Sequence, residues 1–146
     1  MLRTVALLTP PFASLTYAVP EWLAGFAWCP GLRVAVPLGR GMLRIGVVLG
    51  DGSPLPEGVT ARPMLWPLEK EPLLPSGHME MVRQLALRQA VTPGQILAMV
   101  LPAGLRVTQM RLRTMEGQGK AQIRLLKDLP KLPAEVLSAL GEAWMQ

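Results

Sequence analysis

Residues 31–49 read GLRVAVPLGRGMLRIGVVL and decide the fold, because they have the pattern of two short β-strands joined by a tight turn. In the first half, Val34 and Val36 alternate with Arg33 and Ala35, which predicts a strand with one buried face. The return half is almost wholly apolar. We therefore expect a β-hairpin over these residues.

The turn of this hairpin is rich in glycine and proline. Pro37 has no N–H to donate, so we expect it to end the first strand. Gly39 and Gly41 flank Arg40 and permit a positive φ or a close approach to another group. The sequence thus predicts an exposed basic turn between the strands.

The charges around the hairpin are all positive. No acidic residue lies between residues 22 and 50, whereas Arg33, Arg40 and Arg44 all do. Uncompensated arginines at the edge of a small barrel are suited to holding a phosphate-bearing strand. An ordinary surface hairpin with solvated arginines is the commoner source of such a pattern. Local chemistry leaves both interpretations open.

The composition limits the class of protein. The 146 residues suit one domain, or one domain with a small appendage, and half of them are hydrophobic. Fifteen prolines and fourteen glycines favour short strands and loops over long helices. The net charge of +5 favours an acidic partner, either nucleic acid or an anionic membrane surface.

The reactive residues are few. Cys29 and His78 are the sole cysteine and histidine, which excludes an intrachain disulfide and argues against a zinc site. The chain has no GxxxxGK[ST] phosphate loop, no DExH-like box and no acid–base constellation. No apolar run approaches the roughly 20 residues of a membrane span. We expect a cytoplasmic binding protein that is not itself an enzyme, without a cofactor or a membrane partner.

The remaining pattern predicts a mainly β fold with some α-helix. Strands are expected at 3–8, 15–19 and 61–68, in addition to the hairpin. Helices are expected at 76–90, with Ser76 as a possible N-cap, and at 94–100. Residues 1–105 should therefore form a small closed or half-closed barrel of about five strands, packed with one or two helices.

The last part of the chain has a different pattern. Residues 107–115 alternate as a strand would, and residues 134–144 form an amphipathic helical pattern. These forty-odd residues offer a thin core for independent stability. We predict a first domain at 1–105 and a separate segment at 106–146, and we expect the chain to be cut from a longer protein.

Three motifs resemble the amino-terminal domain of one family. Tyr17-x-x-Pro20, then GLRVAVPLG at 31–39 and IGVV at 45–48, are similar to the pattern of primosomal protein N′, the replication-restart helicase PriA. The similarity continues with the basic-Pro-apolar run at 62–65. It ends with Gly94-x-x-Leu97 and a Leu-Pro at 101–102. The resemblance covers about residues 1–105.

The resemblance implies a specific function. In this family the domain is an OB-like barrel that binds the 3′ end of the nascent leading strand at a stalled or branched fork. A winged-helix domain follows, so residues 106–146 would be a partial winged-helix-like segment. The full-length protein is an ATP-dependent 3′–5′ DNA helicase whose ATP and zinc sites lie outside this chain. Its partners would be DNA, other primosome proteins and single-strand binding protein.

The resemblance also carries a terminal-nucleotide pocket onto this chain, and the basic turn adds one phosphate contact. The predicted DNA-binding residues are Leu15, Thr16, Tyr17, Gly39, Arg40 and Arg62.

The sequence departs from the family pattern in two places. Leu15-Thr16-Tyr17 stands where the family has aromatic-Asp-Tyr, and Leu38 stands for a phenylalanine. Thr16 brings one hydrogen-bonding hydroxyl and no charge. Leu15 gives no aromatic face, and stacking on such a face stabilises a bound base by about 1–3 kcal/mol. We therefore expect weaker binding, or looser selectivity for a free 3′-OH.

Two other classes of function stay open on the sequence. A general OB-like binder of single-stranded nucleic acid would bind blocked and free 3′ ends equally. A protein-interaction module would bind an acidic protein and no oligonucleotide. Trp22 and Trp28, in the loop before the hairpin, are expected to pack rather than to stack on bases.

Overall fold

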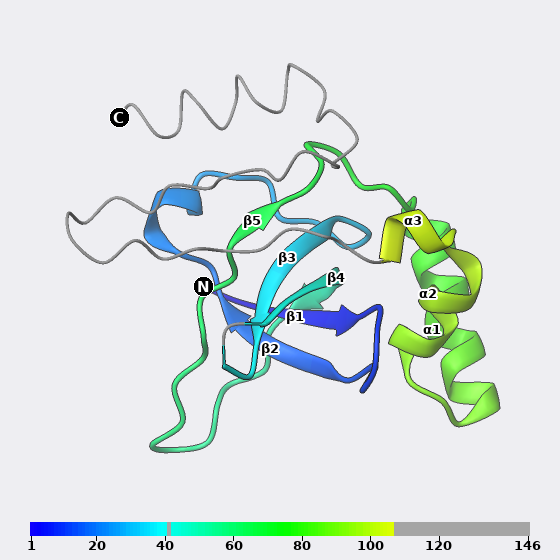
Figure 1. Ribbon diagram of the computed structural model, residues 1–146, viewed down its shortest axis with the longest axis horizontal. Coiled ribbons are helices and arrows are strands. Elements are labelled where there is room, and N and C mark those ends of the chain that lie inside the picture. The colour runs from blue at the N-terminus through cyan, green and yellow to red at the C-terminus, as the bar shows by residue number, and fades with distance from the viewer. Residues whose placement is uncertain (41, 107–146) are drawn as a thin grey trace.

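The computed structural model describes residues 1–40 and 42–106, which form a small β-sheet with helices packed at one side (Figure 1). The predicted strand at 107–115 and helix at 134–144 lie outside the described residues. The mainly β class with added α-helix is confirmed. The elements are β1 (Leu2–Leu7), β2 (Ser14–Ala18), η1 (Glu21–Leu23), β3 (Arg33–Leu38), β4 (Met42–Asp51), β5 (Trp66–Pro67), α1 (Ser76–Gln89), α2 (Pro93–Val100) and α3 (Ala103–Arg106).

The five strands form one antiparallel sheet in the order β2-β1-β4-β3-β5. The predicted hairpin is its centre, with the β3–β4 register running from Arg33↔Val47 to Leu38↔Met42. Strand β4 also pairs with β1, and both of its faces are covered, with Ile45 and Val47 in one core and Val48 in the other. A strand packed on both faces lacks the polar alternation of a half-exposed strand.

Each face of the sheet has its own core. Along β1, Val5 and Leu7 face one cluster while Ala6 and Leu8 face the other, as the period of two requires. The helix-side core lies against α1 and α2; its sheet residues are Ala6, Leu8, Ile45 and Val47. The barrel-side core fills the opposite face and contains Val5, Leu7, Tyr17, Leu23, Trp28, Leu32, Val34, Val36, Val48 and Met64.

Residues 62–68, the closing segment, connect the two edges of the sheet. At one edge, Ala18 N–H donates to the Arg62 carbonyl and Met64 N–H donates to the Ala18 carbonyl, both at 2.9 Å. At the other edge, Leu65 N–H donates to the Ala35 carbonyl at 2.9 Å. The paired sheet is open, and this arrangement is compatible with an OB-like fold.

The strand predicted at 61–68 is much shorter than expected. Only Trp66–Pro67 forms β5, and Pro63 makes an isolated bridge with Ala18. Pro63 and Pro67 have no N–H, so this segment cannot form a continuous ladder on either side.

The prediction that Pro37 ends the first strand is wrong. Pro37 lies within β3 and pairs with Leu43, and Leu38 follows it in the ladder. The carbonyls of Arg33 and Ala35 point to the closing segment, away from β4. Pro37 is two residues further on and has the same orientation, so its missing N–H removes no bond to β4.

The helices begin at well-defined residues. The predicted N-cap at Ser76 is wrong: Pro75 takes that position in an extended conformation, and its carbonyl accepts from the N–H groups of His78 and Met79. Helix α2 has a capping box in which the Thr92 hydroxyl accepts from Gln95 N–H and the Gln95 side chain accepts from Thr92 N–H.

Helix α2 lies very close to the sheet at its first turn. A Cβ on Gly94 would collide with the backbone carbonyls of Leu7 and Phe12, so only glycine permits this approach. In residues 1–40 and 42–106, no helix is long and apolar enough to span a membrane.

Candidate nucleic-acid interface

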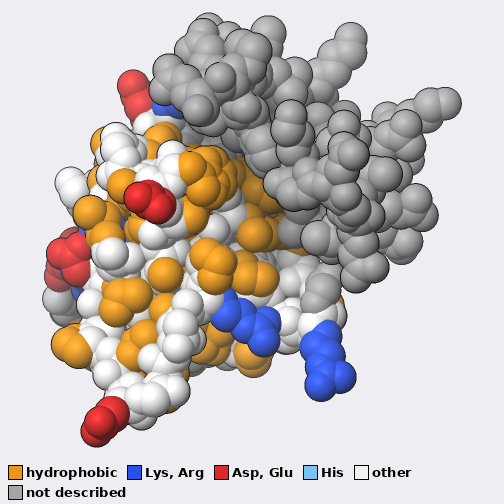
Figure 2. All heavy atoms as spheres, turned by 90° about the vertical axis from the view of Figure 1, so that its left-hand side faces the viewer, with side chains coloured by type: hydrophobic (Ala, Val, Ile, Leu, Met, Phe, Trp, Pro, Cys, Tyr) orange, Lys and Arg blue, Asp and Glu red, His pale blue; other side chains and the backbone are white. Residues whose placement is uncertain are grey.

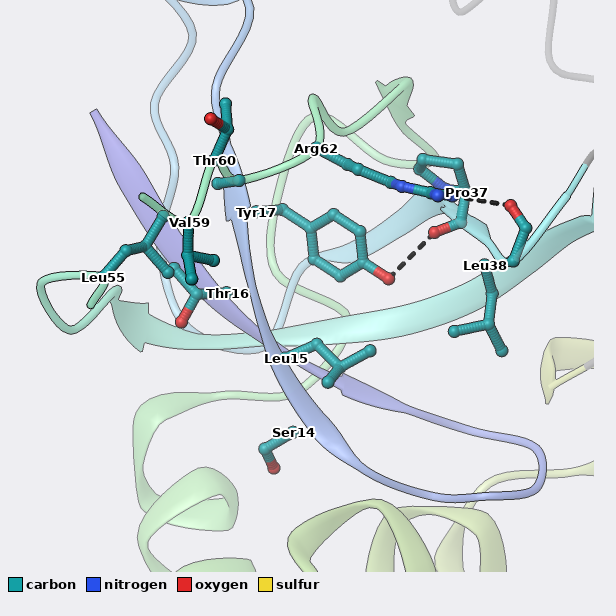
Figure 3. Close-up of a pocket in the computed structure, with 12 residues that line it drawn as sticks. Ser14, Leu15, Thr16, Tyr17, Pro37, Leu38, Leu55, Val59, Thr60 and Arg62 are labelled. Carbon is teal, nitrogen blue, oxygen red and sulfur yellow. Dashed lines mark hydrogen bonds between the residues drawn. The ribbon is translucent and has the colours of Figure 1, made fainter. Parts of the chain in front are cut away.

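A pocket of about 440 Å³ opens at the end of the barrel-side core (Figure 3). Three parts of the chain build it: strand β2, the end of β3, and the loop that leads into the closing segment. Its lining residues are Ser14, Leu15, Thr16, Tyr17, Pro37, Leu38, Gly39, Leu55, Val59, Thr60, Ala61 and Arg62.

Tyr17 fixes one wall of the pocket. Its side chain is almost fully buried in the barrel-side core, and its hydroxyl donates to the Pro37 carbonyl at 3.0 Å. Burial raises the pKa of the Tyr17 phenol, and the positive charge of Arg62 opposes that rise. The phenol therefore stays neutral at neutral pH and holds β2 against β3.

Arg62 extends across the pocket toward the end of β3 (Figure 3). Its Nη1 donates to the Gly39 carbonyl at 2.6 Å, and the residue is exposed. Gly39 has a φ of 61°, which turns the chain so that its carbonyl meets the guanidinium. The arginine and the glycine turn thus form one rim of the pocket.

The lining has a single charge. Among the described residues that surround the pocket, none is acidic and Arg62 alone is ionised at neutral pH. Ser14, Thr16 and Thr60 contribute hydroxyl groups in addition to that of Tyr17, and the rest of the lining is largely apolar. Hydroxyls donate and accept hydrogen bonds, and the guanidinium binds anions, so this arrangement fits a sugar–phosphate group.

The structure brings five of the six predicted DNA-binding residues to this pocket. Leu15, Thr16, Tyr17, Gly39 and Arg62 all line it, although 47 positions separate the first from the last. Arg40 follows Gly39 but is exposed and does not line the pocket. Its contact with phosphate remains a prediction.

Sequence reasoning missed the outer wall of the pocket. Leu55, Val59 and Thr60 lie in residues 52–61, the pocket loop, which connects β4 to the closing segment. The loop matched no motif. The only available signal was its place between a strand and Arg62, a residue already assigned to the site.

The sequence suggested that the arginines of the hairpin have no acidic partner, but the structure gives one of them such a partner. Arg33 forms an ion pair with Glu69, and its Nη1 donates to the Leu105 carbonyl at 2.9 Å. Glu69 comes 36 positions after Arg33, so the local run of charges could not reveal the pair. Arg44 donates to the carbonyl of neighbouring Leu43. Arg33 therefore belongs to the fold rather than to the pocket.

The tryptophans differ in burial. Trp28 packs in the barrel-side core, donates from Nε1 to the Leu23 carbonyl at 3.2 Å and meets Phe26 edge-on, so the packing predicted for it is confirmed. The side chain of Trp22 is half-exposed. Within the described part of the chain, no group of three or more His, Cys, Asp or Glu residues could hold a metal ion.

Figure 2 shows one face of the molecule, on which hydrophobic side chains are widely spread and both acidic and basic side chains are in view. The lining of the pocket differs from this mixed surface, because it contains one arginine and no carboxylate.

The pocket and its surroundings define a binding domain: a small antiparallel sheet with a neutral, hydroxyl-bearing pocket and one arginine at the rim. Residues 4–102 match the family model of the 3′DNA-binding domain (3′BD) of PriA. The chain belongs to this family, whose domain is a DNA-binding module and not a catalytic one. A comparison with curated proteins gave no match.

Proposed function

We propose that the pocket holds the 3′-terminal nucleotide of a DNA strand, and that the domain thereby recognises the nascent leading strand at stalled or branched replication forks. In this proposal the chain is the DNA-end-binding part of a replication-restart helicase, with residues 1–105 as the binding domain. Fork DNA is its first partner, and other primosome proteins or single-strand binding protein are further ones.

One observation carries the proposal. The residues that the family resemblance selected from β2, the Gly39 turn and the closing segment converge on one pocket of a size suited to a small ligand. The lining gives an apolar wall for a base, hydroxyls for a sugar and a guanidinium for a phosphate. The family match supports DNA as the ligand.

The test blocks the pocket without removing any contact. In Gly39→Trp a large side chain stands at the rim, where an added Cβ meets only the flexible end of Met42. Fluorescence anisotropy with a labelled single strand should show affinity for a free 3′ end falling by about tenfold or more, or about 1.4 kcal/mol.

Gly39→Ala is the matched control, because it brings the same backbone strain at positive φ but little bulk. It should bind nearly as the unmodified chain does. A circular single strand, which has no end, should compete weakly. Equal competition by linear and circular strands would make the protein a general single-strand binder and overturn the proposal. Failure to bind any oligonucleotide at low salt would favour a protein-interaction module.

A further inference from the structure

The charge of the pocket lining is positive, because it comes from Arg62 alone. Its twelve lining residues include four hydroxyl side chains and one guanidinium, and no carboxylate is among them. A terminal phosphate carries close to two negative charges at neutral pH. A carboxylate in the lining would repel such a group, whereas this lining attracts it.

Arg62 is positioned to bind an anion. An arginine has five N–H donors, and the Gly39 carbonyl accepts from one of them, at Nη1. This bond directs the guanidinium toward the end of β3, where it lies at the exposed rim of the pocket (Figure 3). A fixed guanidinium that retains further donors binds a phosphate more strongly than a freely rotating one, because less side-chain entropy is lost.

We propose that this pocket accepts strands ending in a 3′-phosphate as well as strands ending in a 3′-OH. The inference rests on the proposed function, because it assumes that the terminal nucleotide occupies the pocket. It extends that function to blocked ends, which arise when a strand is cleaved and the phosphate stays on its 3′ side. Arg62, the one cation of the lining, would bind the added phosphate.

The test compares two strands of the same sequence and the same total charge. One carries a 3′-phosphate and a 5′-OH, and the other a 3′-OH and a 5′-phosphate. Because long-range salt-sensitive attraction is equal for both, any difference reports the local contacts of the strand ends and not the total charge. For the full chain we expect the two dissociation constants to agree within about threefold, or the 3′-phosphate strand to bind more tightly.

Two variants in the pocket and one control outside it separate the charge effect from a folding defect. Thr16→Asp should weaken binding of the 3′-phosphate strand by about tenfold relative to the 3′-OH strand, because it adds a negative charge to the lining. Arg62→Gln should weaken binding of the 3′-phosphate strand more than binding of the 3′-OH strand. Arg88→Gln, the same charge change on the exposed side of α1, should weaken both equally.

The outcomes are distinguishable. If the unmodified chain binds the 3′-OH strand at least tenfold more tightly than the 3′-phosphate strand, the inference is overturned and end recognition stands. If both strands bind no better than a circular strand of equal length, the proposed function fails. Equal binding of the two linear strands, both well above the circular one, supports the inference.

Discussion

At the scale of single residues, the pocket depends on two hydrogen bonds to the end of β3. Tyr17 donates to the Pro37 carbonyl and Arg62 donates to the Gly39 carbonyl, so β2 and the closing segment are both fixed to the same turn. The two side chains also interact electrostatically, since Arg62 lowers the pKa that burial raises at Tyr17. A change at either residue therefore acts on the other.

The phenol of Tyr17 gives a test of this coupling. Its folded-state pKa is raised above the ordinary value of 10.0, so its contribution to stability is full below pH 10. That contribution is lost as the pH rises through the folded-state pKa, because the unfolded chain ionises first. Denaturant unfolding between about pH 8 and 11 should show this loss in the unmodified chain and not in Tyr17→Phe.

Tyr17→Phe should also lower the free energy of unfolding at neutral pH by about 0.5–1.5 kcal/mol, because the Pro37 carbonyl loses its donor. Tyr17 is the sole tyrosine of the chain, so the absorbance of tyrosinate reports its pKa directly. Arg62→Gln should raise that pKa further. A pKa that does not move in Arg62→Gln would contradict the coupling.

At the scale of elements, the periodicity of the sequence predicted those strands and helices whose pattern lies within one short segment of chain. The alternation in residues 33–36 and the apolar return half predicted the β3–β4 hairpin, and the Thr92-Pro93 start predicted α2. The prediction for Pro37 failed because its effect depends on which side of β3 its N–H would face. That orientation is set by the register with β4, which the sequence of β3 alone does not contain.

The same limit applies to the site. The residues of β2, the Gly39 turn and Arg62 could be predicted by family resemblance. The pocket loop could not, because Leu55 and Val59 enter the wall only through the path of the folded chain. The Arg33–Glu69 ion pair could not be predicted for a similar reason, since β5 and the residues after it bring Glu69 back to β3.

Helix α2 provides a prediction at this scale. Gly94→Ala should lower the free energy of unfolding by about 1–3 kcal/mol, because the added methyl meets backbone of β1 and of the following loop that cannot rotate away. Gly77→Ala in α1 is the matched control: its Cβ meets open space, and alanine favours a helix by up to about 1 kcal/mol. Chemical denaturation of both variants should show opposite signs, and equal signs would contradict the close packing of α2.

At the scale of the whole molecule, the closing segment completes the barrel-side core. Its hydrogen bonds link β2 to β3, which stand at different positions in the sheet, and Met64 between them is 1% exposed. Helices α1 and α2 cover the other face, so the two cores share the sheet as their common wall (Figure 1). Stability and pocket shape therefore depend on the same short segment.

Met64→Ala tests this dependence. Removing a fully buried methionine side chain should lower the free energy of unfolding by about 2–5 kcal/mol. Met81→Ala, at a position 44% exposed on α1, should change it by less than about 0.5 kcal/mol. Because Arg62 lies two residues before Met64, strand binding by Met64→Ala should also weaken under conditions where it remains folded. A Met64→Ala protein as stable as Met81→Ala would show that the segment does not complete the core.

The pocket loop has a different relation to the fold from the rest of the site. Residues 53, 54 and 56–60 are exposed, and Leu55 is half-buried, so the loop adds little to either core. Surface loops of this kind tolerate changes of length and sequence far better than strands do. The part of the pocket formed by β2 and the end of β3 is thus fixed by the fold, while the outer wall formed by the pocket loop can change in sequence. One scaffold can then be adapted to chemically different strand ends by changes in the exposed residues of this loop, while Gly52, whose N–H donates to the Leu2 carbonyl, stays fixed to β1.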